Sequence, residues 1–170
     1  MKLGKTQRLK VTRATDYGVY LTDLIPNDDA DNLDIADVLL PKNQAKDLCV
    51  DDVVSAFIYK DSEDRPVATT TLPLITLGEV AVLKCKEITK IGAFLDWGLA
   101  KDLLLPFREQ TKKLEKGEDV LVALYIDKTG RLCATMKVYH YLSKNSPYTK
   151  DERVTGTVYE VSGNFGTFVA

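Results

Sequence analysis

The chain has 170 residues and a formal net charge of −2, and 45% of its residues are hydrophobic while 28% are charged. These proportions are typical of a folded globular protein and exclude a largely disordered chain. No apolar run reaches the roughly 20 residues that span a bilayer, and residues 1–6 are not followed by the apolar stretch of a signal peptide. The composition therefore predicts a cytoplasmic protein with no membrane partner.

Cysteine and histidine are too sparse for the common catalytic and metal sites. Cys49, Cys85 and Cys133 are widely spaced, and His140 is the only histidine. A Cys/His zinc site and a nucleophile–histidine pair are therefore not expected, and His140 is interpreted as an ordinary surface or linker residue. Because no glycine-rich phosphate loop or catalytic carboxylate pair can be named, the sequence predicts no enzyme, no cofactor and no small-molecule substrate.

An acidic segment at residues 27–34 has the composition of a calcium loop but not its pattern. An EF-hand loop needs a glycine at its sixth position and a glutamate at its twelfth. Counted from Asp29, these positions hold Asp34 and Leu40. The segment is interpreted as a solvated loop between strands, and no metal is expected.

The chain contains an internal repeat marked by three glycines. Gly18, Gly92 and Gly166 each follow a polar and a large apolar residue, and each precedes a small, an aromatic and an aliphatic residue. The spacing is 74 positions in both intervals. Two further matches keep the same order, namely 37–41 with 102–106 and 65–70 with 131–136. The order indicates two full copies and the opening of a third.

The second copy shows the elements of one repeat in chain order. Aliphatic and β-branched residues predict strands at 80–88, 92–97, 103–105, 120–126 and 131–138. A polar connection of one or two helical turns is expected at 107–114, and turn residues stand at 116–119 and 127–130. Five short strands with one interruption after the third are typical of a closed barrel. The predicted fold class is therefore all-β, with tandem five-stranded OB-type barrels.

Alternation along the glycine strand separates the interior face from the exterior face. Ala93, Leu95 and Trp97 share one face, which is interpreted as the barrel core. The opposite parity places three aromatic side chains outside, namely Tyr20, Phe94 and Phe168. The glycine is expected where the strand bends sharply to close the barrel.

These motifs resemble the S1 RNA-binding domain of the OB fold. The resemblance is carried by Ile91-Gly92-Ala93-Phe94-Leu95-Asp96, by Leu104-Leu105-Pro106 and by Lys116-Gly117-Glu118-Asp119-Val120. The tandem order is similar to the conserved virulence factor B family of bacterial S1-repeat proteins, which bind RNA and influence gene expression. The resemblance implies an S1-like domain at 1–71, an S1 domain at 76–138, a linker at 139–151 and the beginning of a truncated third S1 domain at 152–170.

The resemblance also implies which residues contact RNA. S1 domains stack bases just before the glycine and two positions after it, and basic side chains follow the phosphates. The stacking candidates are Tyr17, Tyr20, Ile91, Phe94, Phe165 and Phe168. The basic candidates are Lys84, Lys86, Lys90, Arg108, Arg131 and Lys137. Many S1 domains add a histidine on the third strand, where this sequence has Leu40 and Leu105.

Charge separates the copies. The net charge is −4 over residues 1–76, +3 over 77–148 and −1 over 149–170. Because phosphate neutralisation contributes much of nucleic-acid affinity, we expect a non-catalytic protein whose second copy binds single-stranded RNA and which influences bacterial gene expression. The alternative is a protein-interaction or scaffold module, in which the acidic first copy binds a protein partner or packs on its neighbour. An exposed apolar patch at Leu40 and Leu105 would favour that alternative.

Overall fold

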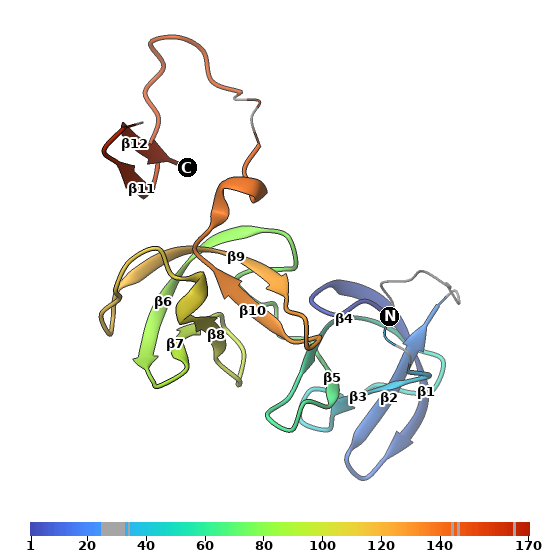
Figure 1. Ribbon diagram of the computed structural model, residues 1–170. Coiled ribbons are helices and arrows are strands. Elements are labelled where there is room, and N and C mark those ends of the chain that lie inside the picture. The colour runs from blue at the N-terminus through green and yellow to red at the C-terminus, as the bar shows by residue number, and fades with distance from the viewer. Residues whose placement is uncertain (25–32, 34, 144, 146, 165) are drawn as a thin grey trace.

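The first barrel is closed and consists of five strands. The computed structural model describes residues 1–24, 33, 35–143, 145, 147–164 and 166–170. The strands of this barrel are β1 (Thr6–Thr15), β2 (Gly18–Asp23), β3 (Val38–Pro41), β4 (Val53–Lys60) and β5 (Pro66–Thr69). They follow one another around the barrel in the order β1-β2-β3-β5-β4 (Figure 1). The parallel pairing of β3 with β5, through Leu39 and Val67, completes the closure.

The second barrel repeats this plan. Its elements are β6 (Val80–Ile88), β7 (Gly92–Asp96), β8 (Leu103–Pro106), the 3-10 turn η1 (Phe107–Glu109), β9 (Asp119–Ile126) and β10 (Leu132–Thr135). The sheet order β10-β9-β6-β7-β8 is the order of the first barrel, written from its last strand. Its edge strands β8 and β10 lie against each other, but no backbone pairing among the described residues closes this sheet as β3 and β5 close the first. The all-β class and the tandem barrels are confirmed.

The last strand of the second barrel is shorter than predicted. It ends at Thr135, and Val138–Tyr141 forms a second 3-10 turn, η2. The backbone N–H of Met136 donates to the carbonyl of Glu109, and the N–H of Lys137 donates to the hydroxyl of Thr135. These bonds draw the chain away from β9, so the prediction of a strand to residue 138 is wrong at its end.

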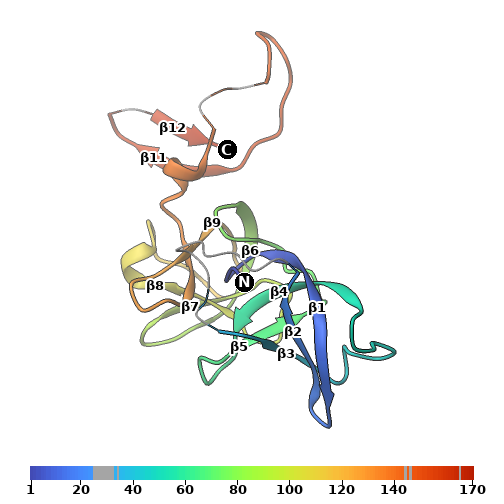
Figure 2. The same cartoon turned by 90° about the vertical axis from the view of Figure 1, so that its right-hand side faces the viewer.

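A two-stranded hairpin follows and stands apart from both barrels in two perpendicular views (Figures 1 and 2). It pairs β11 (Val158–Ser162) with β12 (Gly166–Val169). Its register shifts by one residue opposite Phe168, as β1 shifts opposite Tyr20 and β6 opposite Phe94. The hairpin thus has the pairing of the first two strands of each barrel. That it opens a third S1 domain stays a prediction.

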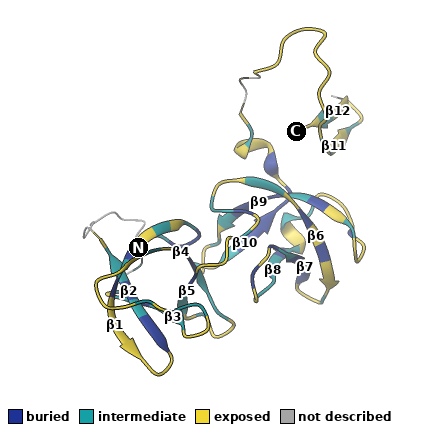
Figure 3. Ribbon diagram, turned by 180° about the vertical axis from the view of Figure 1, so that it is seen from behind, coloured by how far each residue is buried: buried dark blue, intermediate teal, exposed yellow. Residues whose placement is uncertain are grey.

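Alternation of side chains builds the two barrel cores, and buried positions line the strands on their inner faces (Figure 3). Ala93, Leu95 and Trp97 are all buried in the second core, as predicted. Val19 and Leu21 hold the corresponding places in the first core.

The repeated glycine lets the third strand come close to the second. Gly92 pairs with Pro106 and has φ +153°, and a Cβ placed on it would lie 2.3 Å from the carbonyl oxygen of Leu105. Gly18 has the same relation to the carbonyl of Leu40, at 2.1 Å. The expectation of a sharp bend is thus refined, because the constraint is the approach of a neighbouring backbone.

The two barrels share part of one core. Along β4, Ala56 and Ile58 point into the first barrel, while Phe57 points out of it and belongs to the core of the second. The Phe57 side chain is only 1% exposed, and its ring meets that of Trp97 edge-on with centroids 5.7 Å apart. Tyr59 also packs against Trp97, at 6.3 Å.

Hydrogen bonds also hold the two barrels together beside the shared core. The N–H of Gly4 donates to the carbonyl of Ile58, and the carbonyl of Gly4 accepts from the N–H of Leu77, both at 2.8 Å. The ammonium group of Lys101 donates to the carbonyl oxygens of Lys60 and Asp61, at 3.3 and 2.7 Å. These bonds link the C-terminal end of β4 to the second barrel directly through Lys101, and through Gly4 to the segment that leads into the second barrel.

Replacing Gly92 by Ala tests the close approach of β7 and β8. We expect Gly92→Ala to lower the free energy of unfolding by at least about 2 kcal/mol, because the added methyl group clashes with a backbone carbonyl. Gly117→Ala is the matched control, since Gly117 also has a positive φ (+87°) but has open space around it. Urea denaturation measures both. Equal losses for the two variants would contradict the role given to Gly92.

Replacing Phe57 by Ala tests the shared core. We expect Phe57→Ala to lower the stability by about 3–5 kcal/mol, as for a fully buried aromatic ring, and to destabilise both barrels together. Tyr17→Ala, which removes an exposed ring from the same barrel, should change the stability by less than about 0.5 kcal/mol. Denaturation followed by Trp97 emission and by far-ultraviolet circular dichroism should give coincident transitions. Separate transitions would show that the barrels fold independently.

Candidate nucleic-acid interface

Each barrel has a pocket on the outer face of its second and third strands. The first-barrel pocket, of about 450 Å³, is lined by Tyr17 and Tyr20 together with Leu39. The pocket on the second barrel, of about 220 Å³, is lined by Ile91 and Phe94. The structure therefore places the four candidates from the two barrels in two corresponding pockets.

The third-strand residues that face these aromatic rings differ from the predicted ones. Leu40 and Leu105 are fully buried in the barrel cores, so the idea that they could form an exposed patch is wrong. In the register of the sheets, Leu39 lies opposite Tyr20 and Leu104 lies opposite Phe94. Side chains alternate along a strand, so a shift of one residue exchanges the outer face for the core.

An arginine covers the aromatic ring of the first-barrel pocket. The guanidinium carbon of Arg13 lies 3.6 Å from the centroid of the Tyr20 ring, which is a cation–π contact. Arg13 is held there by Asp37, with an N–O distance of 3.0 Å. Tyr17 is 79% exposed. One face of Tyr20 is thus already occupied by a side chain of the protein.

The second-barrel pocket lies at the junction and is completed by the first barrel. We call it the junction pocket. From the second barrel its lining residues are Ile91, Phe94, Trp97, Lys101, Asp102, Leu103, Leu104, Arg131, Leu132 and Cys133. From the end of β4 and the hairpin after it, they are Tyr59, Lys60, Ser62 and Asp64. Sequence reasoning did not find this wall. The available signal was the run Phe57-Ile58-Tyr59, which is apolar on both faces of a strand.

Most of the predicted cations are held in ion pairs on the protein surface. Lys84 pairs with Asp119 and Lys86 with Asp102, both at 2.8 Å. Arg108 and Lys137 both lie near Glu109, at 3.8 and 3.6 Å. Arg131 pairs with Asp64 across the barrel junction. Lys84 and Lys86 have different partners, so these two basic candidates belong to separate ion pairs.

Cys133 lines the junction pocket, and its thiol is influenced by one carboxylate and three cations. Burial, together with the charge of Asp127, raises the pKa of the Cys133 thiol to about 11. The positive charges of Arg108, Arg131 and Lys101 oppose this rise. Two of these three cations were candidates from the sequence, and Lys101 was missed.

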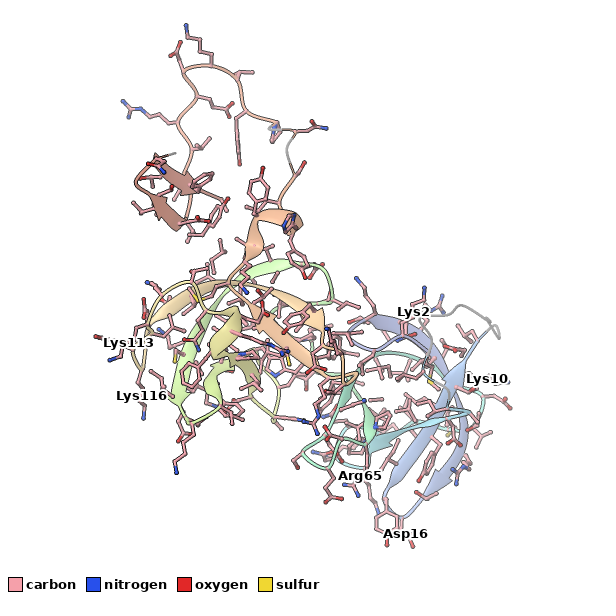
Figure 4. The ribbon with its side chains drawn as sticks, in the orientation of Figure 1. Lys2, Lys10, Asp16, Arg65, Lys113 and Lys116 are labelled. Carbon is pink, nitrogen blue, oxygen red and sulfur yellow. The ribbon has the colours of Figure 1, made fainter. Side chains whose placement is uncertain are left out.

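The remaining candidates lie elsewhere or outside the described residues. Lys90 is exposed beside Ile91, and Phe168 is half-buried against Tyr159 with ring centroids 6.1 Å apart. Phe165 and most of the acidic segment 27–34 fall outside the described residues. Lys113 and Lys116 lie on the side of the second barrel that is turned away from the first (Figure 4).

The described part of the chain shows neither a metal cluster nor a membrane-spanning helix. Within it, no three His, Cys, Asp or Glu side chains come together as metal ligands. No helix among the described residues is long and apolar enough to cross a bilayer. Cys49, Cys85 and Cys133 are all free thiols.

Comparison with known proteins agrees with this architecture. The chain is 29% identical to the uncharacterised protein YitL of Bacillus subtilis, over 97% of the chain and 56% of that protein. It is 26% identical to conserved virulence factor B of Staphylococcus saprophyticus, over 55% of the chain and 33% of that protein. The chain thus spans about half the length, or less, of these relatives.

A solved structure shows the same fold. It is that of a multidomain protein with nucleic acid binding domains from Streptococcus pneumoniae, which superposes with a TM-score of 0.65 at 20% identity. The superposition covers 98% of this chain and 58% of the other. The family model of the S1 domain matches residues 3–71 and again residues 77–137. The chain therefore belongs to the S1 domain family.

Proposed function

We propose that the protein is a non-catalytic RNA-binding protein that holds single-stranded RNA at the junction pocket and so influences bacterial gene expression. The observation that carries this proposal is the pocket itself. Its lining brings the ring of Phe94 together with three cationic side chains, those of Lys60, Lys101 and Arg131. Stacking on an aromatic ring and neutralisation of phosphates are the two contributions that bind single strands. The relationship to proteins with S1 domains supports it.

The ion pairs around the pocket are compatible with phosphate binding. Arg131 and Asp64 keep about half of their side chains exposed, and Lys86 is similarly accessible. Exposed pairs contribute only about 0–1 kcal/mol, so a phosphate can replace the carboxylate at small cost. The free protein therefore keeps its cations oriented at the pocket without binding them tightly.

The protein-interaction alternative rested on the acidic first copy, which would bind a protein partner or pack on its neighbour. An exposed apolar patch at Leu40 and Leu105 would have favoured it, but both residues are buried. The acidic first barrel packs on its neighbour through Phe57 and Tyr59. The first barrel therefore has a role in the chain that requires no protein partner.

Removing the Phe94 ring tests the proposed function. We expect Phe94→Ala to weaken binding of a short labelled oligouridylate by about 1–3 kcal/mol, the contribution of one stacked base. Phe107→Ala is the control, because Phe107 is exposed on the same barrel but does not line the pocket. Fluorescence anisotropy at two salt concentrations measures both variants. Binding by the unaltered protein that does not weaken with salt, or no binding at all, would contradict the proposal.

Asp64 offers a second test, because it occupies a backbone position that suits glycine. Its φ is +61°, and the corresponding residue of the second barrel is Gly130, with φ +72°. We expect Asp64→Gly to relieve this conformation and free Arg131, which should strengthen RNA binding by about two- to five-fold at low salt. The slope of log affinity against log salt concentration should become steeper by up to the contribution of about one phosphate contact.

Asp47→Gly provides the matched control for Asp64→Gly. Asp47 also has a positive φ (+65°), carries the same charge and is exposed on the first barrel outside both pockets. If the two variants bind oligouridylate with equal affinity, then Asp64 does not compete with phosphate for Arg131.

A further inference from the structure

We propose that the junction pocket receives a single unstacked base of the RNA, and that the first barrel contributes one wall and a cation, Lys60, to this site. The inference rests on the proposed function but goes beyond it. It assigns a binding role to the barrel whose net charge is negative. It also makes base recognition a property of the two barrels together.

The shape of the junction pocket suits a flat aromatic ligand. Phe94 and Leu104 line one side, and Lys60 and Ser62 line the side that the first barrel supplies. The cavity of about 220 Å³ has room for several water molecules, at roughly 30 Å³ each, and hence for one planar ring. A mainly apolar pocket with a few fixed polar groups is the usual form of a site that orients a small ring.

The charge of the pocket suits a base attached to phosphates. Both carboxylates of the lining are paired with cations, Asp64 with Arg131 and Asp102 with Lys86. The uncompensated charge of the lining is therefore that of Lys60 and Lys101. Lys101 donates to two backbone carbonyls, and Lys60 has no carboxylate partner among the residues that the structure describes. Lys60 is thus available to an acceptor on the ligand.

The wall from the first barrel is fixed in position before any ligand binds. The Asp61 carboxylate accepts hydrogen bonds from the N–H groups of Glu63 and Arg65, which closes the hairpin. The ammonium group of Lys101 ties the same hairpin to the second barrel through the carbonyls of Lys60 and Asp61. A preorganised wall reduces the entropy lost on binding.

The corresponding pocket of the first barrel lacks these features. Arg13 already lies on the ring of Tyr20, whereas the second barrel has Glu87 at the corresponding bulge, opposite Phe94. No cation–π contact to Phe94 is found within the described part of the chain. The ring of Phe94 is therefore the one left open to a base.

Trp97 reports directly on the occupancy of the pocket. It is the single tryptophan of the chain and lines the junction pocket. The experiment titrates the full chain with a short labelled oligouridylate and with an abasic ribose-phosphate oligomer of the same length. Anisotropy of the label measures total binding, and the emission of Trp97 measures entry into the pocket.

The decisive variant is Lys60→Met, with Lys46→Met as its matched control. Lys46 is an exposed lysine of the same barrel and lines neither pocket. We expect oligouridylate, but not the abasic oligomer, to change Trp97 emission. Lys60→Met should weaken oligouridylate binding roughly ten-fold, the size of one hydrogen bond from a charged group, whereas Lys46→Met should weaken it less than about two-fold. Thermal denaturation verifies that both variants fold.

Two outcomes would overturn this inference while leaving the proposed function intact. In one, oligouridylate binds but leaves Trp97 emission unchanged, and the Lys60 and Lys46 variants bind equally. In the other, the abasic oligomer changes Trp97 emission as much as oligouridylate does. If neither oligomer changes the anisotropy, the proposed function itself is wrong.

Discussion

The packing of Phe57 against Trp97 is the contact on which the arrangement of the two barrels depends. Strand β4 is apolar on both faces, so it forms a wall of the first core and also part of the second. Because both faces of β4 are held, the hairpin after it has a defined position beside Phe94. The bonds from Lys101 to the end of β4 hold the hairpin there. A nucleic-acid site at this place belongs to the pair of barrels.

The two copies share a framework and differ in the charges placed on it. In both, a glycine allows the third strand to approach, and a bulge lies opposite the outer aromatic ring. An aspartate before the third strand is paired in both, Asp37 with Arg13 and Asp102 with Lys86. Arg13 covers its ring, whereas Lys86 makes no cation–π contact with Phe94 in the part of the chain that the structure describes. A few substitutions around one framework thus separate a covered face from an open one.

Local patterns predicted much of the fold because they depend on neighbours in sequence. Strand β6 has the predicted bounds, and the inward face of β7 follows from its alternation. The base-facing position of the third strand was assigned to Leu40 and Leu105, one residue away from Leu39 and Leu104. The resemblance on which that assignment was based does not specify the register of the strand. The junction pocket could not be predicted from either copy alone, because Asp64 and Arg131 are 67 positions apart. The run Phe57-Ile58-Tyr59 is apolar at successive positions, which is a signal for a strand buried on both faces but does not specify which surface covers the second face.

Chemical-shift mapping tests most directly the claim that both barrels form one site. Amide spectra of the full chain would be recorded during titration with a short oligouridylate. Perturbations are predicted for Phe94 and Leu104 in the second barrel and, with the same apparent affinity, for Lys60 and Ser62 in the first. Perturbations restricted to the second barrel, or centred on Tyr17 and Tyr20, would contradict the account.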